Sequence, residues 1–460
     1  MAEPKGTRQI DAAGTQVAKR IPESVGTRVL LGAILTGTLS VLDSTLVIPL
    51  LTSIGRSVGA TTEVSWLVAG YLLTSTVTIP LWGRWLDLRG ERSAMWIAIW
   101  VFVAGTIVSM LAPSLLVLVL GRLLQGVGAG GLVPVGQAII AARCTSEERA
   151  RLQVYYNVAY GIAAGLGPLV GGLLVEVSWR WAFALMIPVT IIAGALLWGQ
   201  LTSKAREVET RKFDSLGTIL MTAGLTLLLL GIEGSRIWAL ASGVILLVGF
   251  VMHALRRRDG IVPASLLTSR TIVASVTVAL AIGFVQFSML TYLPLLSQRV
   301  APSLNAGLVV IPLTVLWMTL GAFTGLLALR VGTRRLAVLS MLFAGASALS
   351  VLASTAYGSL LVASVLVGIA AGLILIPTLL LCQHAAPSED VGAATSFAVL
   401  MRNFGGAAGA AVTAVLLADG GVTAAFGTLA LVAAVALVPA LLLPSAGSER
   451  RLLAARDAAG

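Results

Sequence analysis

Long runs of apolar residues recur along almost the whole chain and constrain its fold more than any other feature. A helix needs about 20 such residues to cross the core of a bilayer. Fourteen runs of roughly that length can be marked, at 28–51, 64–86, 95–112, 115–141, 152–176, 180–201, 216–233, 237–255, 271–296, 305–329, 335–354, 358–384, 391–417 and 421–443. We therefore predict an all-α integral membrane protein with fourteen transmembrane helices.

Composition excludes the soluble classes of protein. Of the 460 residues, 57% are hydrophobic and only 11% are charged, whereas soluble domains carry about 25% charged residues. The two cysteines form no CxxC pair, and neither a Ser/His/Asp constellation nor a phosphate loop of the form GxxxxGK[ST] is present. We expect no enzyme activity, no metal, no cofactor and no ATP-driven transport.

The spans fall into groups of six, two and six, separated by charged stretches. An inserted pair leaves the orientation of later helices unchanged, so the two groups of six can be parallel repeats with a substrate site near the midplane between them. A weak echo supports a repeat, because the stretch at 83–92 follows the second span and a similar one at 325–334 follows the tenth. We expect a tail (1–27), a six-helix bundle (28–203), a linker with the inserted pair (204–258), a second six-helix bundle (259–443) and a second tail (444–460).

Basic residues are distributed unequally between the two sides of the membrane. With both termini cytoplasmic, most of the 31 Lys and Arg residues fall in cytoplasmic segments, as the positive-inside rule requires. The exceptions are Arg56, Arg180, Arg236 and Arg299 on the outer side and Arg122 and Arg402 within spans. The first 27 residues lack the features of a signal peptide. The basic residues behind the net charge of +11 therefore serve to orient the helices in an inner or plasma membrane. They do not indicate nucleic-acid binding.

Asp43 is an acidic residue deep inside the first span, and Arg28 is the nearest charge before it. An ionisable group within the hydrocarbon region indicates a functional site by default, because a lone carboxylate there is costly. Such a group must be protonated, be paired or face water. A side chain that can switch among these states is a candidate proton carrier.

Arg122 lies at the same predicted depth as Asp43. Counted along their helices at 1.5 Å per residue, both residues are roughly 11–12 Å below the outer edge of the membrane. Opposite charges relieve each other's desolvation, so we expect a pair that is ionised when closed and takes up a proton when the two residues separate. A static ion pair is the alternative. Asp43→Asn discriminates the two, because loss of a static pair would impair folding.

Arg402 has no carboxylate partner within the second group of spans, so it should face a water-filled cavity, backbone carbonyls or an anionic ligand. A contact with cargo and a structural role both remain open for it. Gln286 and Asn403 are candidate cavity residues or ties between helices. Aromatic side chains that would suit a large apolar cargo are Tyr156, Tyr160, Tyr292 and Trp317.

Five short motifs occur at particular spans. They are Leu42-Asp43-Ser44-Thr45-Leu46-Val47 in the first, Gly83, Asp87, Gly90 and Arg92 after the second, Arg122-x-x-Gln125-Gly126 in the fourth, Gly167-Pro168-x-x-Gly171-Gly172 in the fifth, and Arg402-x-x-Gly405-Gly406 in the thirteenth. In this order they resemble the major facilitator superfamily, and specifically its fourteen-span drug:proton antiporters. The chain departs from the family pattern at Ile48, Leu88 and Ala163.

This resemblance implies roles for several residues. The loop with Gly83, Asp87, Arg89, Gly90 and Arg92 would lock the two halves on the cytoplasmic side. Gln125 would belong to the cavity region, and the element from Gly167 to Gly172 is typical of antiporters and not of nutrient symporters. Its glycines also have a simple packing interpretation, since small residues let membrane helices approach closely.

The sequence thus predicts a monomeric transporter that exchanges protons for amphipathic small molecules and exports them by alternating access. A dedicated exporter of an endogenous lipid, antibiotic or siderophore is a second possibility. A membrane receptor or channel without transport activity is a more remote one, because it leaves the six-two-six arrangement unexplained.

Overall fold

The computed structural model describes residues 26–47, 50–58, 66–144, 146–174, 177–201, 214–233, 236–257, 260–301, 306–419 and 421–449, and every element in these ranges is a helix. The first group comprises α1 (Thr27–Val47), α2 (Leu51–Val58), α3 (Trp66–Met110), α4 (Leu115–Arg143), α5 (Ser146–Leu174) and α6 (Arg180–Leu197). Two helices follow, α7 (Ser215–Glu233) and α8 (Ile237–Arg256). The remainder are α9 (Ala264–Thr268), α10 (Arg270–Val300), η3 (Ala306–Val310), α11 (Ile311–Val331), α12 (Thr333–Ala353), α13 (Tyr357–Ala385), η4 (Ser388–Asp390), α14 (Val391–Asp419), α15 (Gly421–Val435) and α16 (Leu437–Leu442).

Within the described ranges, eleven helices are long and apolar enough to cross a membrane. The prediction of an all-α membrane protein is therefore confirmed, whereas the number of fourteen spans stays a prediction. α3 counts once among the eleven although it is bent, and α7 contributes a shorter apolar stretch at Ser215–Leu228.

α3 reverses direction at Gly90, whose φ of 82° and ψ of 169° lie outside the helical region. Glycine reaches this conformation without strain because it has no Cβ. Before the bend, residues 71–75 run parallel to residues 126–130 of α4. After the bend, residues 102–109 run antiparallel to residues 121–128 of the same helix. The two arms of α3 therefore form a hairpin around α4.

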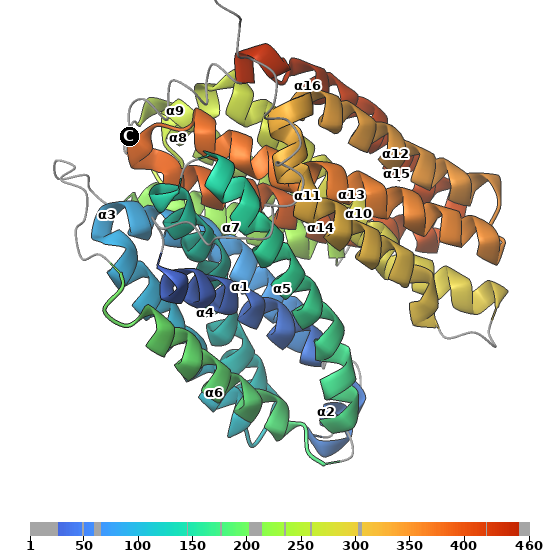
Figure 1. Cartoon of the computed structure of the whole chain (residues 1–460). Helices are drawn as coiled ribbons and strands as arrows, with labels where there is room; N and C mark the ends of the chain where they lie inside the picture. Colours follow the sequence, from blue (N-terminus) through green and yellow to red (C-terminus); the bar gives the residue numbers. More distant parts are fainter. Residues whose placement is uncertain are drawn as a thin grey trace, which may run out of the picture.

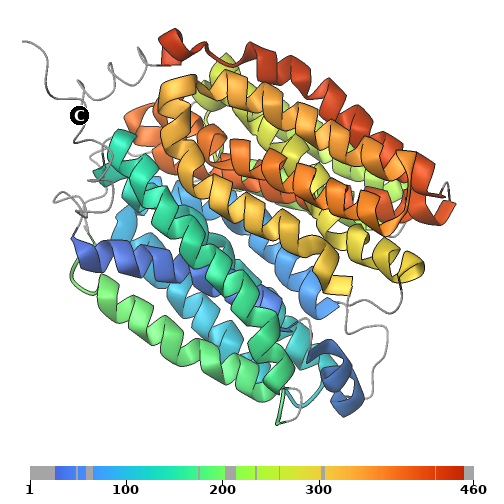
Figure 2. The same cartoon turned by 45° about the vertical axis from the view of Figure 1, so that its right-hand side comes forward.

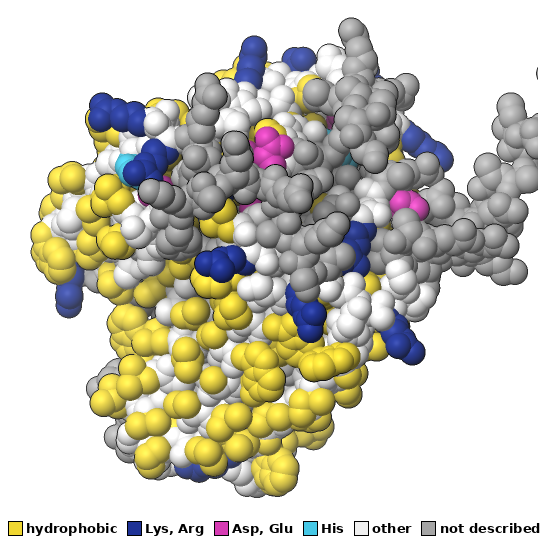
Figure 3. All heavy atoms as spheres, turned by 90° about the vertical axis from the view of Figure 1, so that its left-hand side faces the viewer, with side chains coloured by type: hydrophobic (Ala, Val, Ile, Leu, Met, Phe, Trp, Pro, Cys, Tyr) yellow, Lys and Arg dark blue, Asp and Glu magenta, His cyan; other side chains and the backbone are white. Residues whose placement is uncertain are grey.

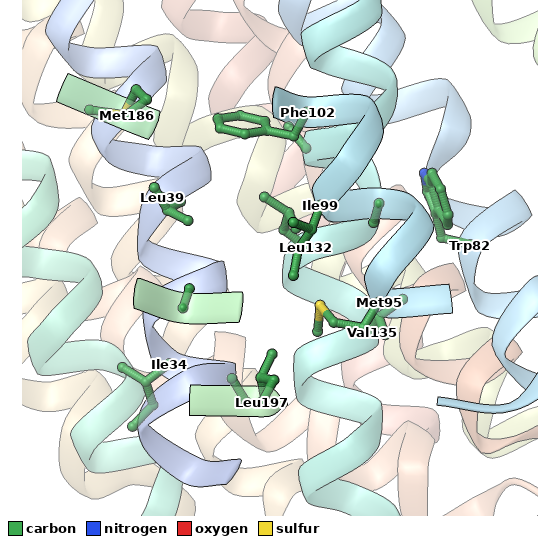
Figure 4. Packing of buried hydrophobic residues seen from close by; sticks show 14 of the residues in the cluster. Ile34, Leu39, Trp82, Met95, Ile99, Phe102, Leu132, Val135, Met186 and Leu197 are labelled. Carbon is green, nitrogen blue, oxygen red and sulfur yellow. The ribbon is translucent and has the colours of Figure 1, made fainter. Parts of the chain in front are cut away.

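The first bundle consists of α1 to α6 around a shared apolar core. Phe102 and Ile99 of α3 lie against Leu132 of α4, and Met186 of α6 approaches Leu39 of α1 (Figure 4). All five side chains are buried. The core thus draws on helices from the whole first group and holds their relative rotations.

The second bundle has its own core, formed by α10 to α16. Phe426 of α15 and Met289 of α10 are fully buried in it, together with small residues of α12 and α13. α10 and α14 run parallel and in close contact, since Leu280, Phe284 and Ser288 meet successive turns of α14. Figures 1 and 2 show the two bundles as separate groups of helices, blue to green and yellow to red.

α7 and α8 pack against each other and join a third apolar cluster. Met221 of α7 and Phe250 of α8 lie in it beside Val77 of α3 and Phe397 of α14. The helix pair therefore contacts elements of both bundles. Most of the charged linker predicted before it, 202–213, lies outside the described residues.

The side of the molecule on which α1 begins and α16 ends is called the tail side below. In Figure 1 the two bundles come together toward this side and diverge toward α2. Figure 3 shows Lys and Arg side chains gathered in the upper part of one face and apolar side chains covering its lower part. Such a continuous apolar surface suits contact with lipid.

Candidate functional site

Asp43 of α1 and Arg122 of α4 form an ion pair inside the first bundle. Arg122 Nη1 donates to Asp43 Oδ2 over 2.6 Å. The two residues are 1% and 0% exposed, so neither charge is solvated by bulk water. Each charge is therefore stabilised chiefly by the other and by hydrogen bonds from nearby groups.

Gln125 completes this site on the next turn of α4. Its amide nitrogen donates to Asp43 Oδ1 over 2.9 Å, and its carbonyl oxygen accepts from Arg122 Nη1 over 2.7 Å. The same nitrogen lies 2.9 Å from the hydroxyl of Thr106 in α3, which donates to the carbonyl of Phe102. Both carboxylate oxygens of Asp43 are thus hydrogen-bonded, one to a cation and one to a neutral amide.

Arg122 is also held by α3. Its Nε donates to the carbonyl of Leu67 over 3.0 Å, and its guanidinium lies 4.2 Å from the ring centre of Tyr71. A cation over an aromatic face is attracted by the ring quadrupole, more strongly when water is excluded. α3 and α4 therefore fix the positive partner, and any movement of α1 against them would change the distance to Asp43.

A cavity of about 210 Å³ lies between the two bundles. Its lining includes Ser40 and Ser44 of α1, Tyr71 and Thr76 of α3, Gln137 of α4, Tyr156 and Tyr160 of α5, Phe287 of α10, Trp317 of α11, Thr378 of α13, and Arg402 and Asn403 of α14. Tyr71 lies between this cavity and Arg122, and its hydroxyl donates to the carbonyl of Ser40 over 3.0 Å. Asp43 is next to the cavity in space but is sealed from it.

Five of the predicted cavity residues line this space, namely Tyr156, Tyr160, Trp317, Arg402 and Asn403. Gln125, Gln286 and Tyr292 are absent from the lining among the described residues. Gln125 belongs to the ion-pair site, Tyr292 donates to the carbonyl of Ala410 in α14, and Gln286 is fully buried. Sequence could not separate these groups, because the rotation of each helix about its axis is set by packing.

Arg402 faces the cavity beside an aromatic wall. Its guanidinium carbon lies 5.6 Å from the ring centre of Trp317, and that ring meets Tyr160 edge to face at 6.2 Å. The Nε of Arg402 is buried and has no hydrogen-bond partner among the described residues. The cation is thus placed to interact with whatever fills the cavity.

Asp87 of α3 caps the start of α14 at the tail side. The backbone N–H groups of Gly392 and Ala393 donate to its two carboxylate oxygens over 3.2 and 3.0 Å. Gly83 lies one turn earlier, where an added Cβ would stand 2.7 Å from the carbonyl oxygen of Gly392, so only glycine fits. These contacts join the first bundle to the second.

The other predicted gating residues are spread more widely. Arg89 and Arg92 are exposed on either side of the Gly90 bend. In α5, Gly167 lies against Thr45 of α1, and Gly171 is buried. Pro168 and Gly172 lie within α5, but their side-chain surroundings fall outside the described residues.

Three polar residues of the site were missed by the sequence analysis. Tyr71 separates the ion pair from the cavity, Thr106 supports Gln125, and Gln137 lines the cavity. Tyr71 and Gln137 could have been predicted, because they are large polar groups within long apolar runs. Thr106 could not, because a threonine hydroxyl can bond a carbonyl of its own helix and so gives no sign of another partner. Within the described ranges, no cluster of three His, Cys, Asp or Glu side chains could hold a metal ion.

Comparison with known proteins gives a consistent family. A model described as Major Facilitator Superfamily matches residues 33–410 and 315–459. The multidrug transporter protein MdtP of Bacillus subtilis is 26% identical over 410 residues, covering 86% of this chain and 76% of MdtP. MdtD of Escherichia coli is 30% identical over 318 residues, or 65% of this chain and 66% of MdtD.

The fold is also that of solved transporters. The crystal structure of the human organic anion transporter MFSD10 superposes with a TM-score of 0.70 and 17% identity, covering 91% of this chain and all of MFSD10. At this identity the likeness supports the fold alone. Together with the match to the family model over most of the chain, it leads to one conclusion: the chain belongs to the major facilitator superfamily and is a secondary transporter, not an enzyme.

Proposed function

We propose that this transporter exports amphipathic small molecules in exchange for protons, by alternating access. The observation that carries the proposal is the buried acid of Asp43, held between Arg122 and Gln125 immediately behind the cavity. A carboxylate in such a place is a functional group by default. The name of MdtP as a multidrug transporter is consistent with this cargo class.

In this mechanism the ion pair couples proton binding to helix movement. While Arg122 is close, Asp43 remains ionised. When α1 moves away from Arg122 and from the α3 and α4 contacts that hold it, desolvation favours the protonated acid. Tyr71 lines the cavity and lies against Arg122, so its movement would open a path for water or a proton from the cavity to the ion pair.

The proposal includes a topology. We place fourteen spans in two six-helix bundles, 28–203 and 259–443, with the inserted pair within 204–258 and both tails on the cytoplasmic side of an inner or plasma membrane. The tail side would then be cytoplasmic, and the Asp87 contacts would close it. The transporter would act as a monomer.

The decisive experiment compares the wild type with Asp43→Asn in proteoliposomes whose lumen is more acidic than the medium. One pH unit is worth roughly 1.4 kcal/mol per proton, which supports up to about tenfold accumulation of cargo per proton exchanged. We expect the wild type to accumulate a fluorescent amphipathic dye from a test panel. Asp43→Asn should fold and insert but only equilibrate the dye.

Thr36→Val is the matched control, because Thr36 is a buried residue of the same helix whose hydroxyl bonds the carbonyl of Ala33 in its own turn. It should accumulate dye like the wild type. An inserted Asp43→Asn protein that still accumulates dye to the wild-type level on a pH gradient would refute proton coupling through Asp43. Loss of folding in Asp43→Asn would indicate a static pair that holds the first bundle together.

A further inference from the structure

The cavity between the two bundles carries a positive charge and no negative one among its described lining residues. Its lining contains hydroxyls, amides and aromatic rings, yet Arg402 is its single charged residue and no carboxylate is among the lining residues that the structure describes. A cavity with one sign of charge and low-dielectric walls concentrates ions of the opposite sign. The cavity should therefore attract anions and repel cations.

Nearby acids do not cancel this charge. Asp43 is sealed from the cavity and already paired with Arg122, so these two charges compensate each other. Asp87 lies at the tail side, where it accepts two backbone N–H groups of α14. The charge of Arg402 therefore remains uncompensated within the cavity.

The guanidinium is also positioned for recognition. Its Nε has no partner among the described residues, and the ring of Trp317 lies 5.6 Å from its carbon. Arginine presents a planar fork that matches carboxylate and sulfonate-like oxygens, and Trp317 with Tyr160 forms an aromatic corner beside it. An aromatic anion could place its charge on Arg402 and its ring against this corner.

We propose that the cavity selects small aromatic anions, such as aryl carboxylates or sulfonates, with Arg402 as the group that recognises their charge. The inference rests on the proposed transport function for its physiological meaning but concerns binding, so it can be tested without a gradient. Asn403, the neighbouring neutral residue of the lining, would contribute hydrogen bonding without setting charge preference.

The test uses three probes with one aromatic body: naphthalene-2-sulfonate, the neutral naphthalene-2-sulfonamide and a naphthyl trimethylammonium ion. Binding to the full-length protein in nanodiscs is followed by quenching of tryptophan fluorescence, with Trp317→Phe identifying the signal from the cavity. We expect the sulfonate to bind at least tenfold more tightly than the ammonium ion. Arg402→Gln should abolish this ratio, and Arg402→Lys should preserve most of it.

Asn403→Ala is the matched control, because it removes a neutral lining group, and it should leave the sulfonate bound at least tenfold more tightly than the ammonium ion. Equal or tighter binding of the ammonium ion by the wild type, or an unchanged ratio in a folded Arg402→Gln protein, would overturn the proposal. Failure here is distinguishable from failure of the proposed function. Gradient-driven accumulation of a cationic or neutral dye would support proton-coupled export and contradict anion selection. Selective binding of the anion without gradient-driven accumulation would support anion selection and contradict proton-coupled export.

Discussion

At the scale of residues, the ion pair of Asp43 and Arg122 combines two charges that are each too costly to bury alone. Removing one partner of a buried pair typically costs about 3–5 kcal/mol, because the other charge is left uncompensated, whereas removing both costs far less. We therefore expect Arg122→Gln to lower the stability of the protein strongly. The double variant with Asp43→Asn should recover most of that loss.

The measurement is thermal unfolding in detergent, followed by the loss of the monodisperse peak on size exclusion. Asp43→Asn alone should cost less than Arg122→Gln, since its amide can still accept from Arg122 and Gln125 can reorient. If the two single losses simply add in the double variant, the residues do not interact energetically and the contact of 2.6 Å has no stabilising role.

Sequence reasoning could place this pair because depth in a helix follows from counting residues. Both side chains were expected at one level, and the structure brings them together. Counting does not give direction around the helix axis, so the interposed ring of Tyr71 and the bridging amide of Gln125 were not foreseen. Their positions depend on the packing of α3 against α4.

At the scale of elements, run length predicted where helices lie but not how they connect or end. The stretch from 64 to 112 was expected as two spans, and the structure shows two helical arms there that follow each other without a loop and reverse at Gly90. The start of α7 is a second example. Asp214 accepts the backbone N–H of Gly217 over 3.0 Å and contacts the ring of His253 in α8 at 2.8 Å, which ties the two helices together.

This cap predicts a pH dependence of stability. Burial alone would raise the pKa of Asp214, but the hydrogen bonds from Gly217 and His253 outweigh it and hold the pKa below its ordinary value of 3.8. A lowered pKa means that the native state favours the ionised form. The stability it contributes is therefore complete above pH 3.8 and is lost as the pH falls through the lowered value.

Asp214→Ala should thus lower the free energy of unfolding at pH 7 by about 1 kcal/mol, the usual contribution of a helix cap. The variant should therefore unfold at a lower temperature than the wild type. The gap should narrow as the pH falls below 3.8. Glu449 provides a control of opposite sign, since burial raises its pKa while Thr333 donates to it. The stability that protonated Glu449 contributes is lost as the pH rises above 4.5, so Glu449→Gln should become more stable relative to the wild type over that range. A gap for Asp214→Ala that is constant from pH 7 to 3 would contradict the cap.

At the scale of the whole molecule, the two bundles have separate cores and are joined by contacts of a different kind. α5 meets α11 through Tyr160 and Trp317 beside the cavity, whereas α3 meets α14 through Asp87 at the tail side. Separate cores can move as rigid bodies about such contacts. The conformation of the transporter should therefore be sensitive to the few bonds that hold the tail side together.

Asp87→Ala should shift the molecule toward a state in which the tail side is open. The lost carboxylate accepts two N–H groups at the start of α14 and complements the helix dipole there, a stabilisation of about 1–2 kcal/mol. A change of this size alters the ratio of two states by about 5- to 30-fold. Spin labels at Arg89 of α3 and Arg334 of α12, both exposed, would report it as longer distances by pulsed electron paramagnetic resonance.

The parent protein for labelling would have both native cysteines, Cys144 and Cys382, replaced by serine, so that the label reacts only at the introduced positions. Both cysteines are buried, and serine is of similar size. Asp214→Asn is the matched control, because that acid also caps a helix but lies within the α7–α8 pair and not between α3 and α14. It should leave the distances unchanged. If Asp87→Ala gives the parent's distances as well, then the other contacts between α3 and α14, including the close approach at Gly83, hold the tail side without it, and the carboxylate has no part in closing the transporter.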